Sequence, residues 1–178
     1  SGDGQALDAV VLGPRLPARL GTADKRVHLA PQAYLDDLPR LERVLGKPSN
    51  QLVLIGRRHL RSNNSWMHNS ERLVKGPSRC TLLIHPDDAK AKGLVDGAPA
   101  KVSTKIGSIT VPVEVTDEMM RGVVSVPHGW GHNRAGARLR VAQAHAGESV
   151  NDILDSTQID VLSGTSVLTG QPVEVSPG

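Results

Sequence analysis

The chain has 178 residues, of which 38% are apolar, and its formal net charge is +3. This length suits one domain with an additional segment, and a single cysteine excludes an internal disulfide framework. No apolar run approaches the ~18 residues that a transmembrane helix needs, and the N-terminus lacks a signal-peptide pattern. These features predict a cytoplasmic protein or fragment without membrane insertion.

Aromatic residues are nearly absent: the chain has no Phe, one Tyr and two Trp. The core must therefore consist of Val, Leu, Ile and Ala, which favours β-structure.

Charge is unevenly distributed, with six basic residues and one acid between Arg57 and Arg79, and no Lys or Arg after Arg140. This separation suits a ligand with an anionic part and a donor-rich part, although composition alone favours a charged surface without a ligand.

A short helix is predicted within "YLDDLPRLERVLG", in the otherwise irregular first 50 residues. Asp37 is the expected N-cap, Pro39 fits the first turn and Gly46 ends the helix. Its apolar stripe comprises Leu38, Leu41, Val44 and Leu45. Such a helix is typical of a connector that docks on another surface.

From Gln51 onward the pattern indicates β-structure. Short strands are predicted at residues 51–55, 80–84, 100–104, 108–115, 123–126 and 172–175. A two-turn helix should begin at His85-Pro86 and end at Gly93, and the alternation in 108–115 places one face of that strand in the core. Six or seven strands with two or three inserted helices predict a small β-barrel rather than a doubly wound sheet.

Three loops that follow strands carry most of the polar side chains. The first, Gly56–Asn69, contains "RRHLRSNNSWMHN", in which arginines could bind phosphate oxygens and asparagines could bind heterocycle edges. In the second, Pro127–Asn133, the two glycines around Trp130 are typical of backbone that approaches a ligand. The third, Glu148–Asp155, offers Asn and Asp acceptors. An anion site and an exposed basic connector remain equally good interpretations of the first loop.

Several other sites are disfavoured. His128 and His132 are four residues apart, but they flank Gly-Trp-Gly in a loop without a suitably spaced third ligand, which disfavours zinc. Cys80 begins an apolar strand and is expected to be a small core residue. Nucleic acid is excluded as a partner because aromatic residues are too few for stacking and the acidic C-terminal part would repel phosphates.

Five stretches in one order, spanning residues 51–176, together resemble a known domain family. They are "LVLIGRR", "RSNNSWMHN", "LLIHPDDAKAKGLVDGAPAKVST", "GSITVPVEVTDEMMRGVVSVPHGWG" and "VNDILDSTQIDVLSGTSVLTGQPVEV". The set resembles the C-terminal molybdopterin-dinucleotide-binding domain of the molybdopterin oxidoreductases, the superfamily of dimethyl sulfoxide reductase, formate dehydrogenase and nitrate reductase. "LAPQAYLDDLPRL" is similar to the connector that precedes this domain in such enzymes.

The resemblance implies a mainly β, double-psi β-barrel of the aspartate-decarboxylase type over residues 51–178, preceded by a tail and connector helix over residues 1–50. It implies a cofactor, bis-molybdopterin guanine dinucleotide, gripped at its pyrophosphates by arginines and at its pterins by amides. The implied cofactor-binding residues are Gly56, Arg57, Arg61, Asn63, Asn64, Ser65, His128, Gly129, Trp130 and Asn151.

The resemblance also implies that catalysis depends on partners. In this family the molybdenum or tungsten ion is held by a Cys, selenocysteine, Ser or Asp from an earlier domain, so the remaining domains or subunits of the oxidoreductase are the expected partners and the isolated chain should be inactive. Two alternatives remain. One is a double-psi barrel that binds proteins, as in ATPase chaperones, and the other is a small enzyme that self-cleaves at Gly107-Ser108, like aspartate decarboxylase.

Overall fold

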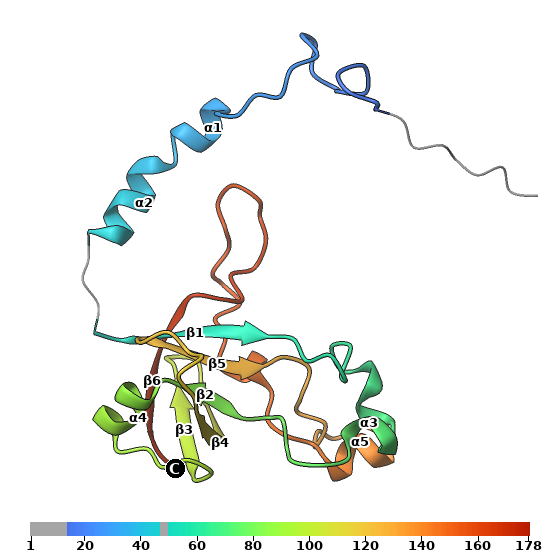
Figure 1. Ribbon diagram of the computed structural model, residues 1–178, viewed down its shortest axis with the longest axis vertical. Helices are drawn as coiled ribbons and strands as arrows, with labels where there is room; N and C mark the ends of the chain where they lie inside the picture. Colours follow the sequence, from blue (N-terminus) through green and yellow to red (C-terminus); the bar gives the residue numbers. More distant parts are fainter. Residues whose placement is uncertain (1–13, 47–49) are drawn as a thin grey trace, which may run out of the picture. The chain divides into compact units, whose positions relative to one another are not determined.

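The computed structural model describes residues 14–46 and 50–178 (Figure 1). The chain divides into two compact units, Ser1–Lys47 and Pro48–Gly178. In the first unit, α1 spans Gln32–Leu35 and α2 spans Leu38–Leu45, followed by Gly46 as the sequence predicts. Asp37 occupies the N-cap position, but its carboxylate pairs with Arg40 at 2.6 Å instead of capping the helix. The predicted tail over the first 13 residues lies outside the described residues.

The second unit is a closed barrel with strand order β1–β5–β2–β4–β3–β6 (Figure 1). The strands are β1 Leu52–Arg57, β2 Leu82–Ile84, β3 Pro99–Ser103, β4 Ser108–Val115, β5 Val123–Pro127 and β6 Gln171–Pro177. Two pairs are parallel, β1 with β5 and β2 with β4, and the other pairs are antiparallel. The predicted mainly β, double-psi barrel is therefore confirmed, and its parallel pairs require the long crossovers that carry the polar loops.

Strict alternation along the strands builds the barrel core. In β4, Ile109, Val111 and Val113 are buried while Thr110 and Pro112 are exposed, as predicted. The core of the described residues is aliphatic apart from Cys80, which is 2% exposed. Aliphatic packing and the buried, structural cysteine are thus both confirmed.

Some predicted boundaries and the helix number are wrong. Strand β1 continues through Gly56 to Arg57, and β2 begins only at Leu82. The described residues contain five α-helices, not two or three. Besides α1, α2 and α4 (Pro86–Lys92), these are α3 (Glu71–Val74) and α5 (Arg140–Ala144), with the 3₁₀ turns η1 (Trp66–Asn69) and η2 (Val150–Asp152). One-turn helices have no apolar period to detect, because the helical pattern needs about two turns.

None of the helices in residues 14–46 and 50–178 is both long and apolar enough to cross a bilayer.

The two-turn helix α4 begins and ends as predicted. Its N-cap His85 accepts a hydrogen bond from the backbone of Asp87 (3.1 Å), and Gly93 ends it in the left-handed conformation with a φ of 67°.

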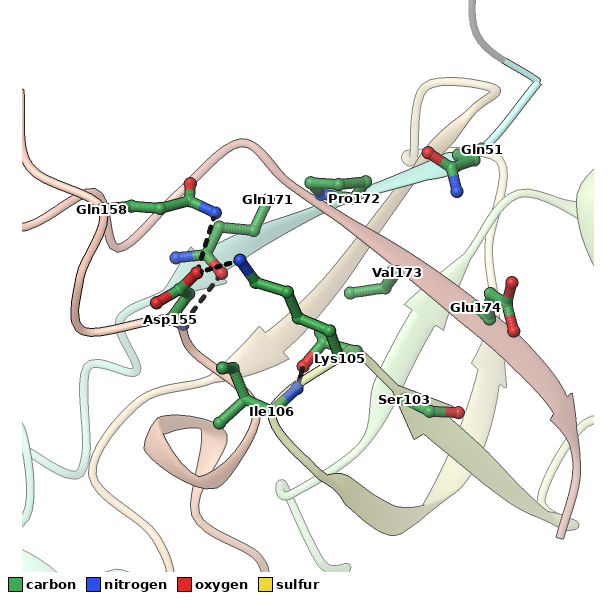
Figure 2. Close-up of a pocket in the computed structure, with 11 residues that line it drawn as sticks. Gln51, Ser103, Lys105, Ile106, Asp155, Gln158, Gln171, Pro172, Val173 and Glu174 are labelled. Carbon is green, nitrogen blue, oxygen red and sulfur yellow. Dashed lines mark hydrogen bonds and ion pairs between the residues drawn. The ribbon is translucent and has the colours of Figure 1, made fainter.

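A polar contact fixes the β3–β4 turn to the segment that precedes β6 (Figure 2). The Lys105 ammonium lies 2.6 Å from the Asp155 carboxylate, which also accepts hydrogen bonds from the backbone and hydroxyl of Thr157. Lys105 and then Thr157 hold the pKa of Asp155 well below its usual range. A cavity of about 410 Å³ adjoins this pair and contains none of the predicted site residues.

Replacing Asp155 by asparagine is expected to lower the melting temperature by several degrees, because the 4%-exposed carboxylate is surrounded by donors that would lose their charged acceptor. The effect should be full at neutral pH and should diminish as pH falls below about 4, because the depressed folded-state pKa stabilises only the ionised form. The matched control is Asp152→Asn, which removes an exposed ion pair to Arg134 and should change little. Equal effects of the two variants would contradict the structural role of Asp155.

Candidate functional site

The barrel places the ends of β1 and β5 together. The two strands run parallel with Gly56 opposite Val126 and Arg57 opposite Pro127, so the loops that follow them leave the barrel at the same end (Figure 1). Because Gly56, Arg57 and Pro127 belong to strands, the first loop is redefined as residues 58–69 and the second as residues 128–133, and the third remains residues 148–155. All ten predicted site residues lie in these loops or at the end of β1.

Close approaches at two glycines join the three loops. A Cβ on Gly129, which has a φ of +95°, would lie 2.2 Å from the backbone oxygen of Asn64. A Cβ on Gly131, which has a φ of +99°, would lie 2.6 Å from the Cβ of Ser149. These glycines therefore allow the second loop to pack against the first and third loops. From the sequence, the spacing of these glycines indicated backbone exposed to a ligand. It did not predict that the glycines contact the other two loops.

The asparagines of the first loop shape its turn. Asn63 and Asn64 have φ values of 41° and 63°, in the left-handed region that asparagine tolerates better than most residues. The Asn64 side-chain oxygen accepts a hydrogen bond of 2.8 Å from Arg58. The amides thus have a conformational role in addition to the ligand role that the sequence predicts.

Arg57 points its guanidinium at the protein. Its Nη1 donates to the Ser125 carbonyl at 2.6 Å, and its Nη2 donates to the Thr81 carbonyl at 2.8 Å and to the Thr81 hydroxyl at 2.7 Å. The Thr81 hydroxyl in turn donates to Glu114 at 2.7 Å. Burial lowers the pKa of Arg57, and the Glu114 carboxylate opposes that shift. Arg57 therefore bridges β1, β5 and the segment before β2, with both terminal nitrogens already bonded.

Two of the cavities at this end of the barrel bring predicted site residues together. The first cavity, about 240 Å³, brings together four predicted residues, Gly56, Arg57, His128 and Asn151. The second cavity, about 730 Å³, is lined by Arg61, Asn63 and Asn64 among others. Ser65, Gly129 and Trp130 line neither of these two cavities.

Arg58 lines both cavities, although the sequence prediction did not select it. Among the residues that the structure describes, no Asp or Glu lines either cavity. Burial lowers the pKa of His59 and of His128, and nearby arginines lower both further, so these rings are neutral near pH 7. The positive charge of the cavities thus comes from arginine. The only sequence signal for Arg58 was its place directly after Gly56-Arg57.

A pair of histidines, buried His68 and half-buried His132, joins η1 to the second loop. His68 is 2% exposed, its Nδ1 lies 2.7 Å from Nε2 of His132, and its ring lies 4.1 Å from that of Trp130. Trp130 thus packs at a loop junction, and His132 pairs with His68 instead of joining His128. Burial and then His132 lower the pKa of His68 to about 4, against a smaller opposing effect of the Gly129 backbone.

The free energy of unfolding should fall as pH drops from about 6.5 to about 4. Over this range the unfolded chain binds a proton at His68, whereas the folded state keeps the ring neutral. The loss attributable to His68 should be on the order of 2 kcal/mol at pH 4. Urea unfolding at a series of pH values should show this slope in the parent chain and a weaker one in His68→Gln. The exposed His145→Gln serves as control, and an unchanged slope in His68→Gln would refute the assignment.

The double-psi barrel has, at its loop end, cavities lined by arginine and by no acidic residue of the described chain, a charge pattern that suits an anionic ligand. The chain belongs to the "Molydopterin dinucleotide binding domain" family, whose model matches residues 52–170. The predicted role as a molybdopterin-dinucleotide-binding domain is thereby confirmed, and the protein-interaction alternative is not favoured.

Known relatives are much longer proteins. The chain is 43% identical over 56 residues to dimethyl sulfoxide/trimethylamine N-oxide reductase of Rhodobacter capsulatus, covering 32% of this chain and 7% of that protein. It is 29% identical over 122 residues to biotin sulfoxide reductase of Cereibacter sphaeroides, covering 67% and 16%. The structure of acetylene hydratase from Pelobacter acetylenicus shares the fold, with a TM-score of 0.61 and 20% identity over 86% of this chain and 21% of that chain.

Proposed function

We propose that this chain is the cofactor-binding part of a cytoplasmic molybdenum or tungsten oxidoreductase and that it grips bis-molybdopterin guanine dinucleotide. Residues 51–178 form the binding barrel, and residues 1–50 form the tail and connector from a preceding domain. The proposal rests on two cavities at one end of the barrel. Arg58 lines both of them, and no Asp or Glu of the described residues lines either. Such a site suits a ligand with diphosphate and heterocyclic parts.

The two cavities suit different parts of such a cofactor. The first cavity offers the Asn151 amide and the neutral His128 ring, which can match donor and acceptor edges of a pterin. The second cavity offers Arg58 and Arg61, which can bind pyrophosphate oxygens in pairs of hydrogen bonds. Arg57 is assigned a positioning role, because its terminal nitrogens are bonded to protein oxygens.

The cofactor and the chain have different roles in this proposal. The bound cofactor would supply the redox chemistry at its metal ion. In residues 14–46 and 50–178, no group of three His, Cys, Asp or Glu side chains is placed to hold a metal ion. Following the family resemblance, we assign the metal ligand and the substrate site to the remaining domains or subunits, while this chain binds and orients the dinucleotide.

Arg58→Gln should weaken binding of inorganic pyrophosphate about tenfold, because loss of one charge-assisted contact is worth roughly 1.5 kcal/mol. Chemical-shift mapping of the isolated chain at millimolar ligand would measure this. Pyrophosphate should shift amides near Arg58 and Arg61, and a simple pterin should shift those near His128 and Asn151. Arg72→Gln, an exposed change in α3, should bind like the parent. Saturating ligand without shifts in these loops would refute the proposed site.

A further inference from the structure

Two side-chain nitrogens beside the His68–His132 contact have no hydrogen-bond partner among the described residues. His68 uses Nδ1 for its contact with His132. Its Nε2 forms no hydrogen bond of ordinary length and angle to any residue that the structure describes, although the Gly129 backbone lies near enough to oppose the lowering of the pKa of the ring. The Nε1 of Trp130 is likewise shielded from solvent and unbonded within the described chain. Two such atoms on rings only 4.1 Å apart are costly, because each gave up hydrogen bonds to water on folding.

Both rings line one small cavity. Its volume is about 10 Å³, close to the space that a single water molecule requires. His59, Arg61, Ser62 and Arg79 also contribute to its wall, and no carboxylate of the described residues does. This wall offers several hydrogen-bonding groups to a bound molecule, and a buried water typically makes about three hydrogen bonds.

We propose that one water molecule is bound in this cavity, where it accepts the Trp130 Nε1–H and completes the hydrogen bonding of His68 Nε2. A polyatomic anion is too large for the cavity, and a cation is disfavoured by two arginines and by an indole that can only donate. Water can both accept and donate, so it suits either tautomer of the neutral His68 ring. The site links the first and second loops. It shares no lining residue with the first cavity, and it borders the second cavity, with which it has His59, Arg61 and Leu73 in common.

A crystal structure of the unaltered chain at high resolution is the direct test. We expect a density peak within about 3 Å of both nitrogens, refining as water. In solution, the Trp130 indole proton should show magnetisation exchange with a long-lived water. Trp130→Phe, which removes the indole N–H, identifies that resonance, and the exchange should persist in Trp66→Phe, which alters an 80%-exposed ring. Absence of exchange at the identified resonance would count against a bound water.

Three outcomes would overturn the proposal. The first is a cavity without density in a well-ordered map, and the second is a direct protein hydrogen bond to either nitrogen. The third is an anomalous peak at the cavity after bromide soaking, which would identify an anion site instead. Because the crystal structure requires no substitution, it decides the matter even where Trp130→Phe fails to fold. Neither result depends on cofactor binding, so the proposed function can fail while the water site stands.

Discussion

Gly129→Ala is expected to destabilise the barrel unit by about 3 kcal/mol or more. The new Cβ would lie 2.2 Å from the Asn64 oxygen and 2.6 Å from its carbonyl carbon, and backbone atoms cannot swing aside as a side chain can. The φ of +95° adds strain for any residue other than glycine. Thermal and urea unfolding would measure the loss, and pyrophosphate mapping should show disturbed shifts in the first loop.

Gly136→Ala is the matched control for this substitution. Gly136 has a similar φ of +88°, but nothing lies within 4 Å of the position of its Cβ. Its replacement therefore carries the strain without the collision and should cost only about 1 kcal/mol. If both variants lose the same stability, the packing of the second loop on the first is not what requires glycine at residue 129.

Arg57→Met is expected to destabilise the barrel unit by about 2–4 kcal/mol, because it leaves the carbonyl oxygens of Ser125 and Thr81 without their donor. Methionine preserves most of the aliphatic stem, so the loss reports mainly on the guanidinium. Arg57→Lys should recover only part of the stability, since an ammonium cannot reproduce the fork geometry. Urea unfolding would measure all three chains.

Arg61→Met, an exposed change, should alter stability by no more than about 0.5 kcal/mol but should weaken pyrophosphate binding. The two arginines are thus expected to separate stability from ligand binding. If Arg57→Met were as stable as the parent chain and lost pyrophosphate binding, Arg57 would be the anion ligand that the family resemblance implied. The positioning role assigned from its hydrogen bonds would then be wrong.

Most of the barrel was predictable because its signals are local. The alternation of Ile109, Val111 and Val113 with exposed residues places β4 correctly, since side chains in a strand alternate between faces. The limits of α4 were predictable from Pro86 and Gly93, whose backbone preferences are intrinsic. The one-turn helices α3 and α5 were not, because contacts with other segments stabilise them. For example, the Asn69 side chain accepts a hydrogen bond from the backbone of Val141 in α5 (3.0 Å).

In the candidate site, too, local features were predictable and long-range contacts were not. The ordered motifs of residues 51–176 identified the family and selected three loops, and the first cavity gathers four of the residues named in advance. The roles of neighbouring arginines depended on long-range partners. Arg57 bonds Ser125, which is 68 positions away in sequence, and this turns its guanidinium inward while Arg58 faces both cavities.

Gly129 and His68 illustrate why the contacts of a side chain could not be predicted from the sequence. Residue type and spacing report what a segment can do, such as adopt a positive φ or carry a proton. Whether that glycine meets a ligand or Asn64, and whether that imidazole meets solvent or His132, depends on which distant segments the barrel closure brings together. Fold, family and loops were accordingly readable in the sequence, whereas the partner of each polar side chain was set by the packing of the three loops.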